Sequence, residues 1–199
     1  MGVVNVRAMH CRRSRLAALR GWGARVLAAG AALLALPALA AEPLAVFADP
    51  ALGVRYEYPA RWRLDPEFQG SSAMVGVTDS SPERGDSHFG IAAGEPALPR
   101  LDEGDEERFI AALRAAVEPG LPRARFQRAG PARLLGRPAV ELVWHHRPLG
   151  VSPRQQVLQL VATVAGGRGY VLRCHYPLPH EAEYAAACDT LRASASLQR

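Results

Sequence analysis

The sequence predicts an α+β fold in which an antiparallel β-sheet of about six to seven strands carries helices on its faces. Two observations support this prediction. Between residues 137 and 177, three segments alternate apolar and polar side chains with the two-residue period of strands, and short connections separate them. Segments 102–118 and 181–197 instead repeat apolar side chains at three- and four-residue steps, which is typical of amphipathic helices. Short connections favour neighbouring strands that run in opposite directions.

The N-terminal segment has the composition of an export signal. Six arginines precede an apolar run at Val26–Leu36, and small residues follow at Ala38 and Ala40. This order of charged, apolar and small residues is typical of a secretory signal peptide. The run is about half of the roughly 20 residues that a membrane-spanning helix needs, so a retained membrane anchor is the weaker interpretation. We therefore predict a signal peptide at residues 1–40, cleaved between Ala40 and Ala41.

Cleavage there leaves residues 41–199 as a single domain in the periplasm or outside the cell. No cysteine stands at the cleavage point, so the sequence does not predict attachment to lipid. The region before the apolar run is long, which leaves the start of translation open between Met1 and Met9.

Removal of the signal also changes the charge of the protein. The whole chain has 24 basic and 19 acidic residues, and without the six N-terminal arginines it has 18 and 19. Binding to nucleic-acid phosphates depends on a concentrated basic surface. The mature composition therefore excludes a nucleic acid as the expected partner.

The first predicted strands lie between residues 54 and 93. Residues 47–50 are predicted to form a short segment that leads into the first strand. The alternation over 54–58 predicts that strand, which ends at Pro59. Two further strands are predicted at 73–78 and 88–93.

The middle of the chain adds a helix and a strand. Acidic residues crowd the beginning of the helix at 102–118, where the helix dipole favours negative charge. After a connector, residues 126–135 predict a strand in which Gly130-Pro131 forms a bulge or bend.

The last helix predicts a disulfide. Its apolar stripe contains Tyr184, Cys188 and Leu191, and Cys174 lies on one face of the preceding strand. If the helix covers that face, Cys174 and Cys188 meet and are expected to bond in an oxidising compartment. Two separate buried thiols are the alternative.

The histidines and acidic residues do not predict a metal site or any other cofactor site. His145 and His146 are adjacent on a strand, so their side chains point to opposite faces. The acidic residues of loop 79–86 lack the spacing of a calcium-binding loop.

Motifs of catalysis are also missing from the sequence. It has no GxSxG motif, no phosphate-binding loop and no dinucleotide fingerprint. The sequence therefore assigns no catalytic residue and favours a protein that is not an enzyme.

Several structural motifs resemble those of a known family. Gly53–Pro59 followed by Trp62 resembles the opening of PsbP-like domains, a group that includes the Ran-binding Mog-type proteins and the bacterial DcrB-related proteins. Gly136–Ala139, Tyr170–Leu172 and Ser194–Leu197 are similar to the second half of that family. The resemblance implies an α/β/α sandwich, whose known members mostly bind proteins rather than catalyse. No functional residue of the family can be placed on this chain.

Two functional hypotheses follow. The favoured one is a non-catalytic accessory domain that binds a protein partner in the cell envelope through the rims at 79–86 and 148–154. The alternative is a small-ligand-binding protein or an enzyme with a pocket lined by Trp62, Trp144 and His146. Neither the identity of the partner nor the oligomeric state follows from the sequence.

Overall fold

The computed structural model describes residues 42–65, 76–79, 87–94, 101, 105–121, 123–148 and 154–198. The predicted signal peptide, its cleavage site and most of the two predicted rims, at 80–86 and 149–153, lie outside these ranges.

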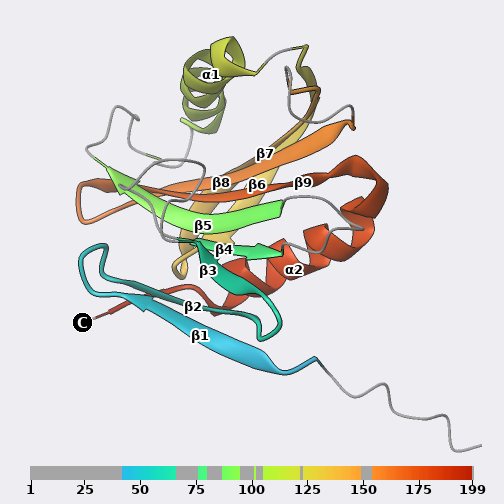
Figure 1. Cartoon of the computed structure of the whole chain (residues 1–199). Helices are drawn as coiled ribbons and strands as arrows, with labels where there is room; N and C mark the ends of the chain where they lie inside the picture. The colour runs from blue at the N-terminus through green and yellow to red at the C-terminus, as the bar shows by residue number, and fades with distance from the viewer. Residues whose placement is uncertain are drawn as a thin grey trace, which may run out of the picture. The chain divides into compact units, whose positions relative to one another are not determined.

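Two antiparallel sheets and two α-helices form the described part of the chain (Figure 1). The larger sheet has the order β3-β4-β5-β9-β8-β7-β6, and the smaller sheet has the order β1-β2-β10. The strands are β1 (Leu44–Asp49), β2 (Val54–Pro59), β3 (Arg63–Asp65), β4 (Gly76–Asp79), β5 (Ser87–Gly94), β6 (Arg125–Leu134), β7 (Arg137–His146), β8 (Gln156–Ala165), β9 (Arg168–Pro177) and β10 (Ser196–Leu197). The helices are α1 (Glu106–Val117) and α2 (Glu181–Ser194), with short 3-10 turns η2 (Glu118–Gly120) and η3 (Leu178–His180).

The predicted fold class is confirmed, with two corrections. The lead-in is a strand, β1, and the first strand pair belongs to a separate three-stranded sheet that β10 completes. The bulge in β6 lies between Phe126 and Arg128 rather than at Gly130-Pro131. Strand β6 is an edge strand and pairs only with β7. Pro131 lacks a backbone N–H, but no second neighbouring strand loses a hydrogen bond because of it.

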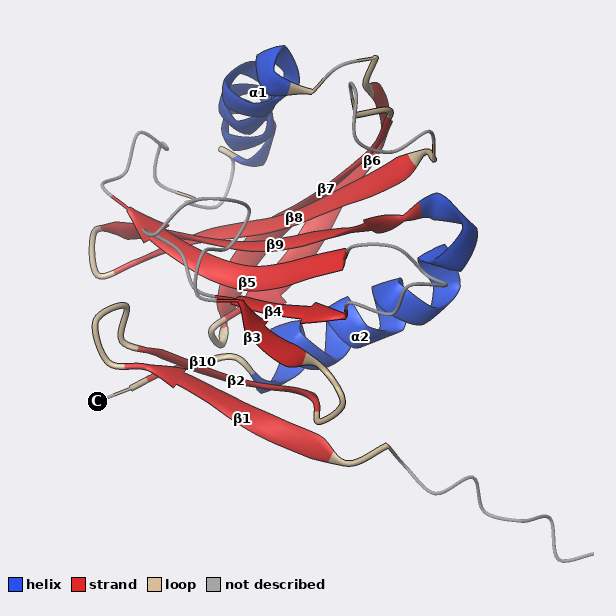
Figure 2. Cartoon of the chain, in the orientation of Figure 1, coloured by secondary structure: helices blue, strands red, loops and turns tan. Residues whose placement is uncertain are grey.

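The two helices lie on opposite faces of the seven-stranded sheet (Figure 2). On one face, the predicted α2 stripe of Tyr184, Cys188 and Leu191 is fully buried. The small sheet joins the same core, because Val54 and Tyr56 of β2 are also fully buried there. On the other face, α1 buries Phe109 and Leu113 against β7 and β8 in a second core; the sheet residues of that core are Val140, Leu142, Trp144, Leu158, Leu160 and Ala162.

The predicted disulfide between Cys174 and Cys188 is present. It joins β9 to α2, and both cysteines are fully buried. Closing a loop of this length, with a sequence separation of 14, restricts the unfolded chain.

Reduction of the disulfide is expected to lower the free energy of unfolding by about 3 kcal/mol, the chain-entropy value for such a loop. Urea unfolding with and without dithiothreitol measures the difference. A variant with both Cys174→Ala and Cys188→Ala is the control, because reductant should leave its stability unchanged. Equal sensitivity of the two proteins to reductant would contradict the prediction.

Candidate functional site

The three predicted pocket residues do not share a pocket. Trp62 lies on the α2 face, where its ring stacks on Phe89 at a centroid distance of 4.3 Å. Trp144 lies on the α1 face and is fully buried, and its indole N–H donates a hydrogen bond to Glu118 Oε1 at 3.1 Å. His146 stands two residues further along β7 and so shares the face of Trp144. The sheet itself separates Trp62 from the other two side chains.

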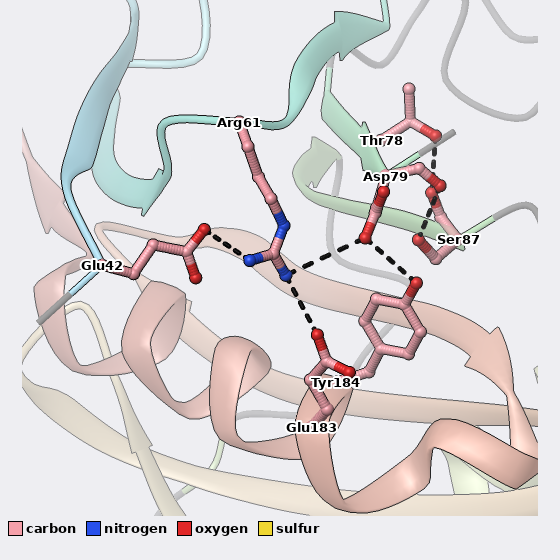
Figure 3. Close-up of polar contacts among 7 residues, drawn as sticks. All are labelled: Glu42, Arg61, Thr78, Asp79, Ser87, Glu183 and Tyr184. Atoms are coloured by element: carbon pink, nitrogen blue, oxygen red, sulfur yellow. Dashed lines mark hydrogen bonds and ion pairs between the residues drawn. The ribbon is translucent and has the colours of Figure 1, made fainter. Parts of the chain in front are cut away.

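Asp79, from the first predicted rim, belongs to a polar network whose other charged members are partly exposed (Figure 3). Its carboxylate accepts a hydrogen bond from the Tyr184 hydroxyl at 3.1 Å and lies 4.0 Å from Arg61. Arg61 also pairs with Glu42 at 2.6 Å and with Glu183 at 3.0 Å. Asp79 is 7% exposed, so it ties β4 to α2 and does not present an acidic surface to a partner.

A row of buried polar side chains crosses the α1 face beside the apolar core. His146 Nε2 lies 2.9 Å from His175 Nε2, and one of these nitrogens donates a hydrogen bond to the other. The pKa of His175 is lowered to about 3, first by burial and then by the nearby charges of His146, Arg173 and His88. Burial also lowers the pKa of His146. Both imidazoles are therefore neutral at pH 7.

Three atoms in this row have no hydrogen-bond partner. They are His146 Nδ1, Gln156 Oε1 and Arg173 Nε, and all three are buried. His146 and Gln156 are cross-strand neighbours, and Arg173 precedes His175 by two residues on β9. Burial lowers the pKa of the Arg173 guanidinium. Buried polar atoms are normally paired, so each unpaired one needs a partner such as a water, an ion or a ligand.

A cleft of about 380 Å³ extends from Arg173 toward α1. Its walls are mostly apolar and include Val117 and Leu121 on one side and Leu160 and Val171 on the other. This volume falls at the lower end of the range for small-molecule sites, about 300–1,000 Å³.

A larger cleft of about 650 Å³ lies between the β6–β7 turn and α2, but its arginines are already paired. Arg192 forms an ion pair with Asp189 at 2.8 Å, and Arg133 donates to the Gly136 carbonyl at 2.7 Å. The smaller cleft is therefore the stronger candidate for a ligand, because the Nε of its partly buried arginine lacks a hydrogen-bond partner among the described residues.

The outer face and the outer edge of β1 form a different kind of candidate site. Leu44 and Val46 are 47% and 50% exposed. The carbonyls of Pro43 and Asp49 accept hydrogen bonds from Ala60 and Gly53, so the odd-numbered residues direct their backbone groups toward β2. The even-numbered residues of β1 consequently direct theirs to the free edge of the sheet. We call Leu44, Val46 and Ala48, with these backbone groups, the β1 edge.

The two candidate sites carry no recognisable catalytic group. Within the described ranges, no group of three or more histidine, cysteine, aspartate or glutamate side chains is placed to hold a metal ion. The part of the chain that the structure describes also contains no helix that is long and apolar enough to span a membrane.

Sequence reasoning missed both Arg173 and the β1 edge. Arg173 is the one arginine inside β9, after Arg168 at its start, and its cross-strand neighbour Leu160 is apolar. An arginine that faces apolar neighbours in a central strand was the available signal. At β1, the signal was that Leu44, Val46 and Ala48 are apolar although the opposite side of the strand already supplies Phe47 to the core.

We predict that the buried histidine pair destabilises the fold in mild acid. The unfolded chain binds a proton at His175 below pH 6.5, whereas the folded chain binds it only near pH 3. The free energy of unfolding therefore falls as the pH decreases from 6.5, by about 2 kcal/mol at pH 5 at 1.36 kcal/mol per pH unit.

Urea unfolding of the wild type and of His175→Gln at pH 7 and pH 5 measures this effect. The loss of stability between the two pH values should be smaller by about 2 kcal/mol in the variant. An identical loss in the two proteins would exclude His175 as its source.

Comparisons with known proteins place the fold. No family model matches the sequence, and no curated protein sequence matches it. Several solved structures do match this chain. Cyanobacterial PsbP (CyanoP) from Synechocystis sp. PCC 6803 is 17% identical and has a TM-score of 0.53, over 83% of this chain and 98% of that one.

Two further solved structures have a similar arrangement. The Ran-binding protein Mog1p of Saccharomyces cerevisiae is 8% identical with a TM-score of 0.52, over 78% of this chain and 96% of its own. LpqN of Mycobacterium tuberculosis, involved in cell envelope biogenesis, is 15% identical with a TM-score of 0.50, over 80% of this chain and 88% of its own. These likenesses confirm the fold that the sequence resemblance implied, while the likeness to DcrB-related proteins stays a prediction. At these identities they establish the fold alone.

Proposed function

We propose that this chain, which has the PsbP-like, Mog-type fold, is a non-catalytic accessory domain of the periplasm or the extracellular space that binds a protein partner. The observation that carries the proposal is the β1 edge. Among the described residues, the outward backbone groups of this short strand pair with no other strand, and its apolar side chains are exposed. A partner segment in an extended conformation can add to such a strand through main-chain hydrogen bonds.

The composition of β1 supports this interpretation. Soluble proteins usually protect an edge strand with a charged side chain, a proline or a bulge. Leu44, Val46 and Ala48 provide none of these, and β1 pairs with β2 without a register shift. The one charged residue of the strand, Asp49, accepts hydrogen bonds from the backbone of the following turn.

The fold supports it as well. Mog1p is a Ran-binding protein and LpqN is involved in cell envelope biogenesis. Because a shared fold does not transfer a partner, the proposal commits only to an extended protein segment as the occupant of the β1 edge.

A photocrosslinking amino acid at position 46 tests the proposal. In extract from the compartment of the protein, we expect an adduct with one protein, identified by mass spectrometry. An excess of unlabelled wild-type protein should reduce the amount of this adduct. An excess of the protein carrying Leu44→Lys and Val46→Lys should not reduce it, because the charges oppose strand addition. The same label at exposed position 168 is the control.

Two outcomes contradict this proposal. An adduct that forms equally from position 168 would exclude specific binding at β1. An adduct with twice the mass of the chain would assign the β1 edge to pairing between two copies of this protein.

The location is a second part of the proposal, supported by the signal-like N-terminal sequence and by the disulfide, which is typical of oxidising compartments. Expression of the whole chain in a bacterium, followed by N-terminal sequencing of the exported protein, should give Ala41 as the first residue. Leu33 lies inside the apolar run, and Leu33→Arg should prevent export because the run must stay uncharged. An exported protein that keeps residues 1–40 would contradict the predicted cleavage.

A further inference from the structure

The α1-face cleft combines apolar walls with one partly buried arginine. Arg173 lies at the cleft, and its Nε is buried without a hydrogen-bond partner. No carboxylate among the described residues forms an ion pair with it. Desolvation of a charged group without a counter-charge is unfavourable, and an anionic ligand at this position would offset that cost.

The groups around Arg173 do not compensate its charge. His146 and His175 are neutral, and each has its pKa lowered in part by Arg173. Glu118 of η2 does not line the cleft, and its Oε1 already accepts hydrogen bonds from Arg114 at 2.7 Å and from Trp144 at 3.1 Å. Among the described residues that line the cleft, Arg173 is the only charged one.

The geometry points to a binding site for a small amphipathic carboxylate, with the carboxylate on Arg173 and the apolar body in the cleft toward α1. A guanidinium matches a carboxylate through two parallel hydrogen bonds. The apolar body would lie between Val117 and Leu121, at the end of α1 and after η2, and Leu160 and Val171 of the sheet.

The volume limits the size of the ligand. About 380 Å³ suits a compact molecule such as a medium-chain fatty acid or an arylalkanoic acid, and excludes a complete two-chain phospholipid. His146 Nδ1 and Gln156 Oε1 also lack partners. A water or a polar substituent of the ligand is suited to satisfy them.

This site is independent of the proposed partner site. The β1 edge belongs to the small sheet on the α2 side, whereas the cleft lies on the α1 face. Failure of either proposal therefore leaves the other standing, and substitutions in β1 should not change ligand binding.

Isothermal titration calorimetry of the folded protein with sodium octanoate tests the inference. We expect saturable binding of octanoate, and at least tenfold weaker binding of octanol, octylamine and acetate. Octanol and octylamine keep the apolar chain without the anion, and acetate keeps the anion without the chain.

Two substitutions test separately the binding of the carboxylate and the binding of the apolar body of the ligand. Arg173→Met keeps the length of the side chain and removes its charge, and should weaken octanoate binding about tenfold to a hundredfold, the factor expected for hydrogen bonds to a charged group. Its melting temperature should equal or exceed that of the wild type, because a partly buried charge without a counter-charge is removed. Ala92→Leu places a larger side chain in the wall of the cleft and should also weaken binding of octanoate.

Arg168→Met is the matched control, because it removes an exposed arginine of the same strand. It should bind octanoate as the wild type does. The inference is overturned if the wild type does not bind octanoate, if octylamine binds as tightly, or if folded Arg173→Met keeps wild-type affinity.

Discussion

The structure depends on the packing of α2 between the two sheets. Tyr184, Cys188 and Leu191 are fully buried, and the disulfide from Cys188 to Cys174 fixes the helix on β9. At the end of the helix, the Ser194 hydroxyl accepts a hydrogen bond from the Glu57 amide of β2 at 2.8 Å. One element thus holds the large sheet and the small sheet together, and the small sheet positions β1 with its outer edge unpaired.

Both cores contain paired polar groups and also buried polar atoms without a hydrogen-bond partner, which on the α2 side are the Tyr56 hydroxyl and Trp62 Nε1. On the α2 face, the Tyr176 hydroxyl donates to Gln159, and Gln159 donates in turn to Glu141, so polar side chains within the sheet satisfy one another. On the α1 face, a shorter helix covers β7 and β8, and Arg173 retains a buried nitrogen without a partner. A cleft of about 380 Å³ lies beside this arginine.

Two groups of polar contacts lie in different parts of the described structure. The network around Arg61 and Asp79 consists of ion pairs and hydrogen bonds between elements of the scaffold. On the α1 face, His146 and His175 share a hydrogen bond between their Nε2 atoms, and their rings stack. The two features proposed for recognition, the β1 edge and the α1-face cleft, contain none of the residues of the Arg61 network.

The sequence by itself determined the fold class, the meander of β7, β8 and β9 and the disulfide, because the two-residue and three-to-four-residue periods report which side chains face a core. Tertiary structure decided where side chains distant in the sequence lie relative to the sheet. Trp62 and Trp144 looked alike as aromatic pocket residues, yet they lie on opposite faces. Likewise, only the position of α1 over the sheet placed Arg173 of β9 at the wall of a cleft. Periodicity reports which face of a strand a residue occupies, but not what covers that face.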